Sequence, residues 1–407
     1  MSIEKIFEGR RFHVFAGLLI AVLTFLVYSN TFHASFHFDD TPQIVENYSI
    51  RNLGNWFDIV RGQRGITMLT FAINYAIGGL NVVGYHVANL AIHIINVILV
   101  YFLLFLTLNH IDLGADLKSA PNRAKKIAIY TALLFAVHPV QTEAVTYIVQ
   151  RMETLASMFM LIGVLSFIKG AETPKTSVRV LLYGAVAVSY LLGFYSKEIA
   201  ITLPAIIFFY DYCFIAHGDM RRLIRRLPLY AVLLALLAFL ATRTLTGLQE
   251  TPGGSAGFAV QSITSKEYFF TQFNVIVYYI TLLLVPINQN LDYDFPISKG
   301  LFEIPVVKEG TVLNFPIPPA FVALIILLGV IGFAVYLLLK RKTDNGDGQR
   351  SLIAFFILWF FIILSPTSSF IPIIDVIFEH RLYLASVGFF TLFSLAFDRG
   401  FEYFGKR

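Results

Sequence analysis

Residues 82–108 read VVGYHVANLAIHIINVILVYFLLFLTL, a run that contains no Asp, Glu, Lys or Arg. A helix needs about 20 apolar residues to cross the hydrocarbon core of a bilayer, and this run exceeds that length. Similar runs recur along the 407 residues, which are 57% hydrophobic and only 14% charged. Soluble domains carry about 25% charged residues, so the composition excludes a soluble globular enzyme. It predicts an all-α integral membrane protein.

Ten apolar segments are predicted as membrane spans. They are 12–29, 82–108, 126–139, 152–169, 178–195, 198–216, 228–245, 318–339, 351–365 and 383–398. The first follows Lys5, Arg10 and Arg11, as the apolar part of a signal peptide would. It is long enough to cross, however, and no small-x-small cleavage site follows it. We therefore predict an uncleaved first helix.

The basic residues lie mostly between alternate spans. These segments are 1–11, 109–126, 169–179, 216–227, 340–350 and 399–407, and they hold 21 of the 31 Lys and Arg residues. Positive residues mark cytoplasmic loops, so both termini are predicted to be cytoplasmic. The net charge of +5 then reflects topology and not nucleic-acid binding. Cys213 is the single cysteine, which excludes an internal disulfide.

The same topology predicts one membrane domain over residues 1–407, whose outer loops 30–81, 246–317 and 366–382 form one functional face. Two apolar segments are not predicted to cross. Residues 66–77 span about 18 Å as a helix, which is too short. A crossing by 267–285 would place the basic residues of the later loops outside. Both are predicted to be interfacial helices on the outer side, and both are suited to frame a lipid groove.

The first outer loop contains an acidic pair. Residues 36–42 read FHFDDTP, directly after the first predicted span. Asp39 and Asp40 repel each other beside an apolar wall and are poorly solvated, so we expect the pKa of one to rise. Such a carboxylate is suited to act as a general base. Asp40 equally fits a helix N-cap followed by Pro in the first turn, and the residues alone do not separate these interpretations.

A second polar motif begins at His138. Beyond it, Glu143, Tyr147, Arg151 and Thr154 recur at spacings of four, four and three, which predicts one helical face that enters a span. Ionisable groups in a span usually face a cavity or a partner, so we favour a functional role over a structural Glu143–Arg151 pair. No second His or Cys lies at a useful spacing from His138, so the motif does not predict a zinc site.

Two further groups suit phosphate binding. Lys197 and Glu198 lie at the outer end of the fifth predicted span, where a Lys binds phosphate as a point charge or extends to the interface. Arg381 follows Glu379 and His380 in the last outer loop. An Arg suits bidentate phosphate recognition, although Glu379 is equally able to neutralise it.

Asp292 and Asp294 add carboxylates to the loop 246–317, where an ordinary polar turn is the simpler interpretation. Each of these groups is a weak indication alone. All of them nevertheless fall on the outer side of the predicted topology, which was derived from Lys and Arg placement without reference to chemistry.

Several short motifs occur together along the chain. They are Phe38-Asp39-Asp40, Asn74-Tyr75, Gly78-Gly79, YHVANL at 85–90, HPVQTE at 138–143, Gln150-Arg151, SKE at 196–198, DYD at 292–294 and EHRLYL at 379–384. Together they resemble the membrane part of the transmembrane and tetratricopeptide-repeat O-mannosyltransferases and their bacterial relatives. These are GT-C glycosyltransferases that use polyprenyl-phosphate sugars. The resemblance covers about residues 30–390.

The resemblance implies a GT-C-type bundle of about ten transmembrane helices in which Asp39 and Asp40 are catalytic. It implies inverting transfer of a sugar from a polyprenyl phosphate to a hydroxyl, with protein Ser or Thr as the expected acceptor. The residues expected to bind the substrate or its phosphate are Arg381, Lys197, Arg151, Glu143, His138, Glu198, Glu379, His380, Asp292 and Asp294. No required cofactor is evident, and no convincing ligand set for a divalent metal can be identified.

The sequence ends at Arg407 without the tetratricopeptide repeats that are usual in this family. We therefore expect either a partner protein or another acceptor, and a lipid or glycan acceptor is the main alternative. A non-enzymatic transporter is the second alternative. Transporters place ionisable residues near mid-membrane, often in broken helices, whereas here they gather at one face. The resemblance implies a polyprenyl-phosphate-linked sugar donor and membrane lipids as partners, and it implies a bacterial inner membrane.

Overall fold

The computed structural model describes residues 9–111, 120–250, 256–340 and 348–405. Lys5 and parts of the predicted cytoplasmic segments 1–11, 109–126, 340–350 and 399–407 lie outside these ranges. The regular secondary structure of the described residues is helical, and β structure among them is limited to one isolated bridge between Ala256 and Ile373. The predicted all-α fold is therefore confirmed.

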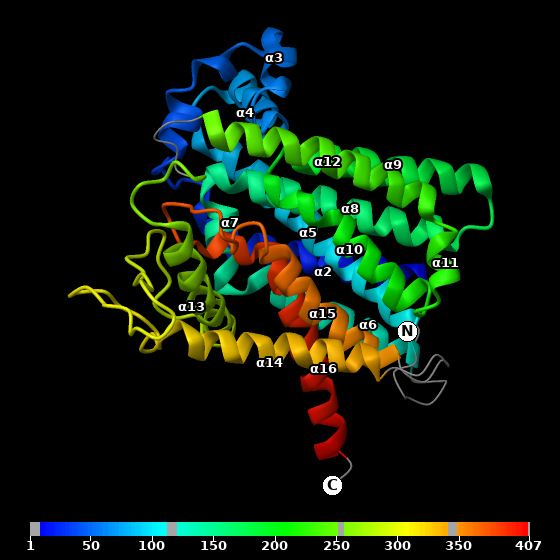
Figure 1. Cartoon of the computed structure of the whole chain (residues 1–407). Helices are drawn as coiled ribbons and strands as arrows, with labels where there is room; N and C mark the ends of the chain where they lie inside the picture. The colour runs from blue at the N-terminus through cyan, green and yellow to red at the C-terminus, as the bar shows by residue number, and fades with distance from the viewer. Residues whose placement is uncertain (1–8, 112–119, 251–255, 341–347, 406–407) are drawn as a thin grey trace. The chain divides into compact units, whose positions relative to one another are not determined.

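The chain forms two compact units, which are described separately. Unit 1 comprises 1–203, 342–349 and 390–407, and unit 2 comprises 204–341 and 350–389. The helices of unit 1 are α2 (Arg10–Tyr28), α3 (Trp56–Arg61), α4 (Gly65–Gly78), α5 (Val82–Asn109), α6 (Ala120–Val137), α7 (Thr142–Thr146), α8 (Arg151–Glu172) and α9 (Thr176–Phe194) (Figure 1).

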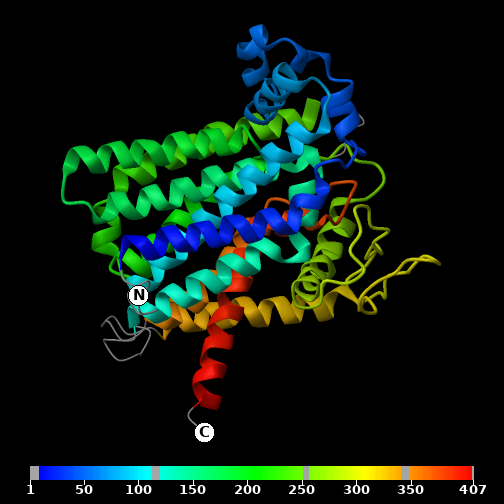
Figure 2. The ribbon, with the colours of Figure 1, turned by 180° about the vertical axis from the view of Figure 1, so that it is seen from behind.

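In unit 1, α5 packs against α2, α6 and α8, and α8 packs against α9. Figure 2 shows α2 in blue alongside α5 and α6. The approach of α8 to α9 depends on Gly170, because a Cβ at that position would lie 2.7 Å from the ring of Tyr183. A side chain there would force the two helices apart.

The helices of unit 2 are α11 (Met220–Ile224), α12 (Leu227–Glu250), α13 (Ser265–Leu284) and α14 (Ala320–Leu339). Three more helices, α10 (Leu203–Tyr210), α15 (Gly348–Leu364) and α16 (Leu382–Gly405), lie partly in unit 2 and reach its boundary. Helix α13 packs against α14, and it begins with a capping box in which Thr264 and Glu267 exchange hydrogen bonds.

Among the described residues, eight helical segments are long and apolar enough to cross a membrane. They are Arg11–Thr31, Val82–Asn109, Ile148–Glu172, Thr176–Phe194, Glu198–Ile215, Leu227–Thr244, Ala320–Leu339 and Glu379–Phe401. Each coincides with one of the ten predicted spans. The predicted spans 126–139 and 351–365 correspond to α6 and α15, which do not reach this standard. Helix α15 has only 17 residues, which is too short. Helix α6 carries three charged residues, Arg123, Lys125 and Lys126, in its N-terminal half.

The two segments predicted not to cross also form helices. Helix α4 has 14 residues, which is about 21 Å of helix and less than the thickness of a hydrocarbon core. It ends at Gly78, and the following Gly79 has a φ of +59°, which is costly for residues with a Cβ. Helix α13 has 20 residues but is not among the segments apolar enough to cross.

Candidate active site

The acidic pair lies in a tight turn of unit 1, immediately before the π-helical turn Thr41–Val45. Phe38 precedes it with a φ of +43°, a left-handed conformation that is uncommon for a bulky residue. The turn gives the two carboxylates opposite surroundings. Asp39 is exposed, whereas Asp40 is 1% exposed. Asp39 is therefore the carboxylate that a substrate can reach.

The buried carboxylate of Asp40 accepts two backbone hydrogen bonds, from the N–H of His37 at 3.0 Å and of Val149 at 2.7 Å. Burial raises the pKa of Asp40 to about 6, although these hydrogen bonds oppose the rise. The predicted rise is confirmed, but its main cause is burial and the repulsion from Asp39 is a minor contribution. Asp40 occupies the N-cap position of the turn without a side-chain capping bond, so its side chain is not a conventional helix cap.

The raised pKa of Asp40 predicts that stability falls with rising pH. The ordinary value is 3.8, so between about pH 4 and pH 6 the native state retains a proton that the unfolded chain releases. Relative to Asp40→Asn, which does not titrate there, the wild type should lose roughly 2–4 °C of apparent Tm across this window. Thermal unfolding of the purified proteins measures this difference. The control is Asp58→Asn, which replaces an exposed aspartate. Parallel curves for wild type and Asp40→Asn would contradict the prediction.

The segment after α7 makes hydrogen bonds with both residues of the acidic pair. The hydroxyl oxygen of Tyr147 accepts the backbone N–H of Asp39 at 2.8 Å, two residues before the Val149 N–H that binds Asp40. Tyr147 is extended, at φ −75° and ψ 109°, and a short 3₁₀ turn, Ile148–Gln150, separates it from α8. The continuous helical face predicted from Glu143 to Thr154 is therefore wrong. The β-branched residues around this break have low helix propensity, which favours the interruption.

Arg151 is fully buried and surrounded by neutral acceptors. Its Nε donates to Asn89 Oδ1 at 2.6 Å, and its Nη1 to Asn74 Oδ1 at 2.6 Å and to both oxygens of Thr70 at 3.3 Å. Its Nη2 donates to the carbonyl of Tyr85 at 3.0 Å. These partners lie on α4 and α5, so Arg151 joins both helices to the start of α8. This geometry favours a positioning role over direct contact with a phosphate.

Lys197 is also buried, at 9% exposure. Its Nζ lies 2.9 Å from Glu153 Oε2 and 3.2 Å from Gln150 Oε1. Burial lowers the pKa of Lys197, and the charge of Glu153 opposes that shift. Glu153 is 1% exposed. The two residues thus form a buried ion pair, and the ammonium is engaged by protein oxygens.

The adjacent Glu198 binds Arg64, a residue of the first outer loop. The Nε of Arg64 lies 3.2–3.3 Å from both carboxylate oxygens of Glu198, and its Nη2 lies 3.0 Å from Oε2. The Nη1 of Arg64 contacts the sulfur of Met152, a weak acceptor, at 3.0 Å. The side chain is 31% exposed, and its φ is +52°. Unlike Lys197 and Arg151, this cation is held in place and remains accessible.

Arg64 is electrostatically coupled to the acidic pair. Burial lowers the pKa of Arg64, but the charges of Glu198, Glu153 and Asp39 outweigh it and the pKa is raised. The contribution of Asp39 is the smallest of the three and acts through space, whereas the ion pair of Arg64 is with Glu198. The first turn of α4 contacts the residue after α9, because the Ile66 N–H donates to the carbonyl of Tyr195 at 3.0 Å.

Arg64 and Glu153 were missed by the sequence analysis. A signal was present for each. Arg64 lies between Gly62 and Gly65, directly before an apolar helix on the predicted outer side. Glu153 is a carboxylate inside a predicted span, where an ionisable residue implies a charged partner.

His138 has a local role in unit 1. Its Nδ1 accepts the backbone N–H of Val140 at 3.2 Å, which caps the 3₁₀ turn Pro139–Gln141. Its ring lies 4.9 Å from that of Phe390. Glu143 is buried in α7 at 7% exposure. The described residues contain no group of three or more His, Cys, Asp or Glu side chains arranged to hold a metal ion.

The remaining predicted residues lie in unit 2, where Glu379 is 2% exposed. Its carboxylate accepts hydrogen bonds from the backbone N–H of Asn290 at 3.0 Å, from the Gln289 amide and from the Tyr293 hydroxyl. The His380 ring stacks on Phe378 at 5.0 Å. Glu379 therefore anchors the loop that follows α13.

Arg381 is buried at 4% exposure. Its guanidinium donates to the carbonyls of Val376 at 3.0 Å and Asp375 at 2.8 Å. These hydrogen bonds link Arg381 to backbone carbonyls five and six residues earlier in the last outer loop. Arg381 and Glu379 belong to unit 2, whereas the acidic pair and Arg64 belong to unit 1.

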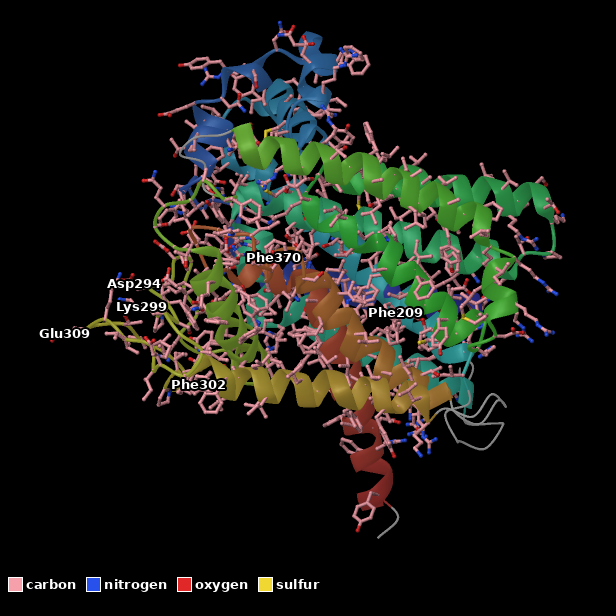
Figure 3. The ribbon with its side chains drawn as sticks, in the orientation of Figure 1. Phe209, Asp294, Lys299, Phe302, Glu309 and Phe370 are labelled. Carbon is pink, nitrogen blue, oxygen red and sulfur yellow. The ribbon has the colours of Figure 1, made fainter. Side chains whose placement is uncertain are left out.

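Asp292 and Asp294 line a polar groove of about 600 Å³ in unit 2. The groove is formed by residues 288–290, 292–294 and 309–312. Asp294 Oδ1 lies 2.5 Å from Lys308 Nζ, and both side chains are exposed. Figure 3 labels Asp294 and Glu309 on the non-helical segment between α13 and α14.

The sequence was also compared with known proteins. It is 27% identical to the human protein O-mannosyl-transferase TMTC4 over 94% of this chain, and 24% identical to the Caenorhabditis elegans protein O-mannosyl-transferase F38B6.6 over 96% of it. The chain is a distant homologue of the TMTC proteins. The Drosophila melanogaster protein O-mannosyl-transferase Tmtc3 is 30% identical over 49% of this chain and 24% of its own length. The predicted resemblance is thereby confirmed.

The chain spans about half the length of the curated TMTC relatives that it matches along nearly all of its sequence, 55% of TMTC4 and 52% of F38B6.6. No protein-family model matches the sequence, and no solved structure matches it.

Proposed function

We propose that this chain is an inverting glycosyltransferase that moves a sugar from a polyprenyl phosphate to the hydroxyl of a protein Ser or Thr. The observation that carries the proposal is that unit 1 holds an exposed carboxylate and an accessible cation within electrostatic range of each other. Asp39 is open to solvent and Arg64, to which it is electrostatically coupled, retains an exposed guanidinium. The homology to protein O-mannosyl-transferases supports the same chemistry.

In the proposed reaction, Asp39 removes the proton of the acceptor hydroxyl as its oxygen attacks the anomeric carbon. The bond from that carbon to the phosphate oxygen breaks, and the bonding electrons leave with the polyprenyl phosphate. One displacement inverts the anomeric configuration. The phosphate leaves as a stable anion, so a general acid is not required. The site instead needs positive charge where negative charge develops.

Arg64 is the residue of unit 1 best suited to that phosphate. Among the residues that the structure describes, the acceptor of its Nη1 is a thioether alone, so an anionic oxygen would replace a weak acceptor by a strong one. Arg151 and Lys197 donate to oxygens of the protein itself. We assign Asp40 to a supporting role, because its carboxylate is buried and held by two backbone N–H groups.

The reaction is tested with the purified chain in proteoliposomes. A polyprenyl-phosphate mannose and a Ser/Thr-containing peptide are supplied, and the glycopeptide is detected by mass spectrometry. We expect transfer to the peptide, with an anomeric configuration opposite to that of the donor by NMR. Retention would contradict the single displacement. Transfer to added lipid or glycan but not to peptide would contradict the proposed acceptor.

A further inference from the structure

The chain between α13 and α14 bends at residues 301–303 and then continues without a bend through an exposed stretch, residues 304–307, which we call the edge segment. Ile304 and Val306 are 72% and 81% exposed, whereas Pro305 between them is buried. Alternate residues of an extended chain point to the same side. The edge segment therefore presents an apolar face, and Figure 3 shows it leading from Phe302, beside α14, towards Glu309.

The backbone of the edge segment is also unpaired. Residues 302–307 make no hydrogen bond with the residues that the structure describes. In an extended strand the N–H groups of alternate residues share one edge. Pro305 interrupts the edge that it shares with Val307, because it has no N–H. The other edge carries the N–H groups of Ile304 and Val306 without interruption, and such an edge is a template for another strand.

The polar groove adjoins this edge through Glu309, two residues beyond the segment. Asp292 and Glu309 line the groove, and neither carboxylate has a partner among the described residues, while Asp294 pairs with Lys308. The orientation of the groove walls is fixed by the buried Glu379, which binds the Asn290 N–H and the Tyr293 hydroxyl. The groove therefore favours a cationic group over an anionic one.

We propose that the edge segment binds an extended polypeptide by strand addition, and that a basic side chain of that polypeptide enters the polar groove. A lipid surface would cover the apolar side chains but would leave the backbone N–H and C=O groups without partners, which is costly in hydrocarbon. A polypeptide strand satisfies both the backbone and the apolar face. The inference rests on the proposed function, since it assigns this surface to the protein acceptor.

The test measures peptide binding to the full chain in nanodiscs by fluorescence anisotropy. The probe is a labelled peptide of alternating Val and Thr with two Lys residues at one end. We expect Val306→Pro, which removes an N–H of the uninterrupted edge, to raise Kd about tenfold. Val307→Pro is the matched control on the interrupted edge and should change Kd by less than about twofold. Thermal unfolding confirms that both variants are folded.

Two altered probes separate the contacts. The probe peptide is N-methylated at every second residue, in two versions that differ by one position. The version that loses the N–H groups facing the edge segment should bind more weakly, and the other version should bind normally. The double variant Asp292→Asn/Glu309→Gln should weaken binding of the Lys peptide but not of a peptide ending in Ser residues. Equal binding by both proline variants would overturn the proposal. So would binding of phospholipid vesicles without peptide binding, or self-association of the chain through this segment.

The binding assay is repeated with Asp39→Asn, which lies in unit 1. Peptide binding should persist in that variant, because the proposal places the docking surface in unit 2. If the wild type binds peptide but transfers no sugar, the proposed transferase fails and the docking surface stands. If it transfers sugar but the edge variants bind normally, the docking surface alone fails.

Discussion

Asp39→Asn should lower kcat for sugar transfer by about a hundredfold to ten-thousandfold, the range that loss of a general base produces. The amide is nearly the same size as the carboxylate but cannot accept the proton of the attacking hydroxyl. Asp39 is exposed, and its backbone N–H, not its side chain, is held by Tyr147. The substitution should therefore leave the turn intact. Initial rates with the lipid-linked donor and peptide acceptor measure the effect.

Asp40→Asn and Asp58→Asn are the comparison variants for this measurement. Asp40 is buried and accepts two backbone hydrogen bonds, so Asp40→Asn should lose less activity than Asp39→Asn. Its main effect should be to remove the fall in stability between about pH 4 and pH 6 that is expected of the wild type. Asp58 is an exposed aspartate of the same loop, on α3, and its variant should retain wild-type activity. A kcat for Asp39→Asn within about threefold of wild type would remove Asp39 from the role of base.

The sequence predicted the helices well because hydropathy is a local property. The length and composition of a run such as 82–108 predict a membrane span without any information from the rest of the chain. The acidic pair was also found, because two adjacent carboxylates after a span are conspicuous in sequence. Which of the two is buried depends on the Val149 N–H, 109 residues away. No local pattern encodes that contact, and the sequence left Asp39 and Asp40 equivalent.

The same reasoning explains what was missed around Lys197 and Glu198. Their presence at the end of a span was evident, but their partners were not. Arg64 contacts Glu198 from a position 134 residues away. The interruption at Tyr147 was missed because spacings of four and three fit a helix, and only the tertiary contact with Asp39 shows why the chain departs from one there.

The second large effect is expected at Lys197. Lys197→Met should destabilise the chain by about 3–5 kcal/mol, the cost of leaving a buried carboxylate without its counter-ion. That carboxylate belongs to Glu153, whose Oε2 binds Lys197 and whose Oε1 is buried without a hydrogen-bond partner among the described residues. Replacing both partners, as Lys197→Met/Glu153→Gln, should recover most of the lost stability. Thermal unfolding and the yield of folded protein measure this.

The double variant also decides which cation contacts the phosphate. If Lys197 serves only Glu153, the stable double variant should retain transfer, whereas Arg64→Met should lose it about a hundredfold while remaining folded. Arg64 fits that expectation because its ion pair with Glu198 is partly exposed and contributes little to stability. If instead the double variant is stable but inactive and Arg64→Met is active, Lys197 contacts the donor phosphate and the assignment to Arg64 is wrong.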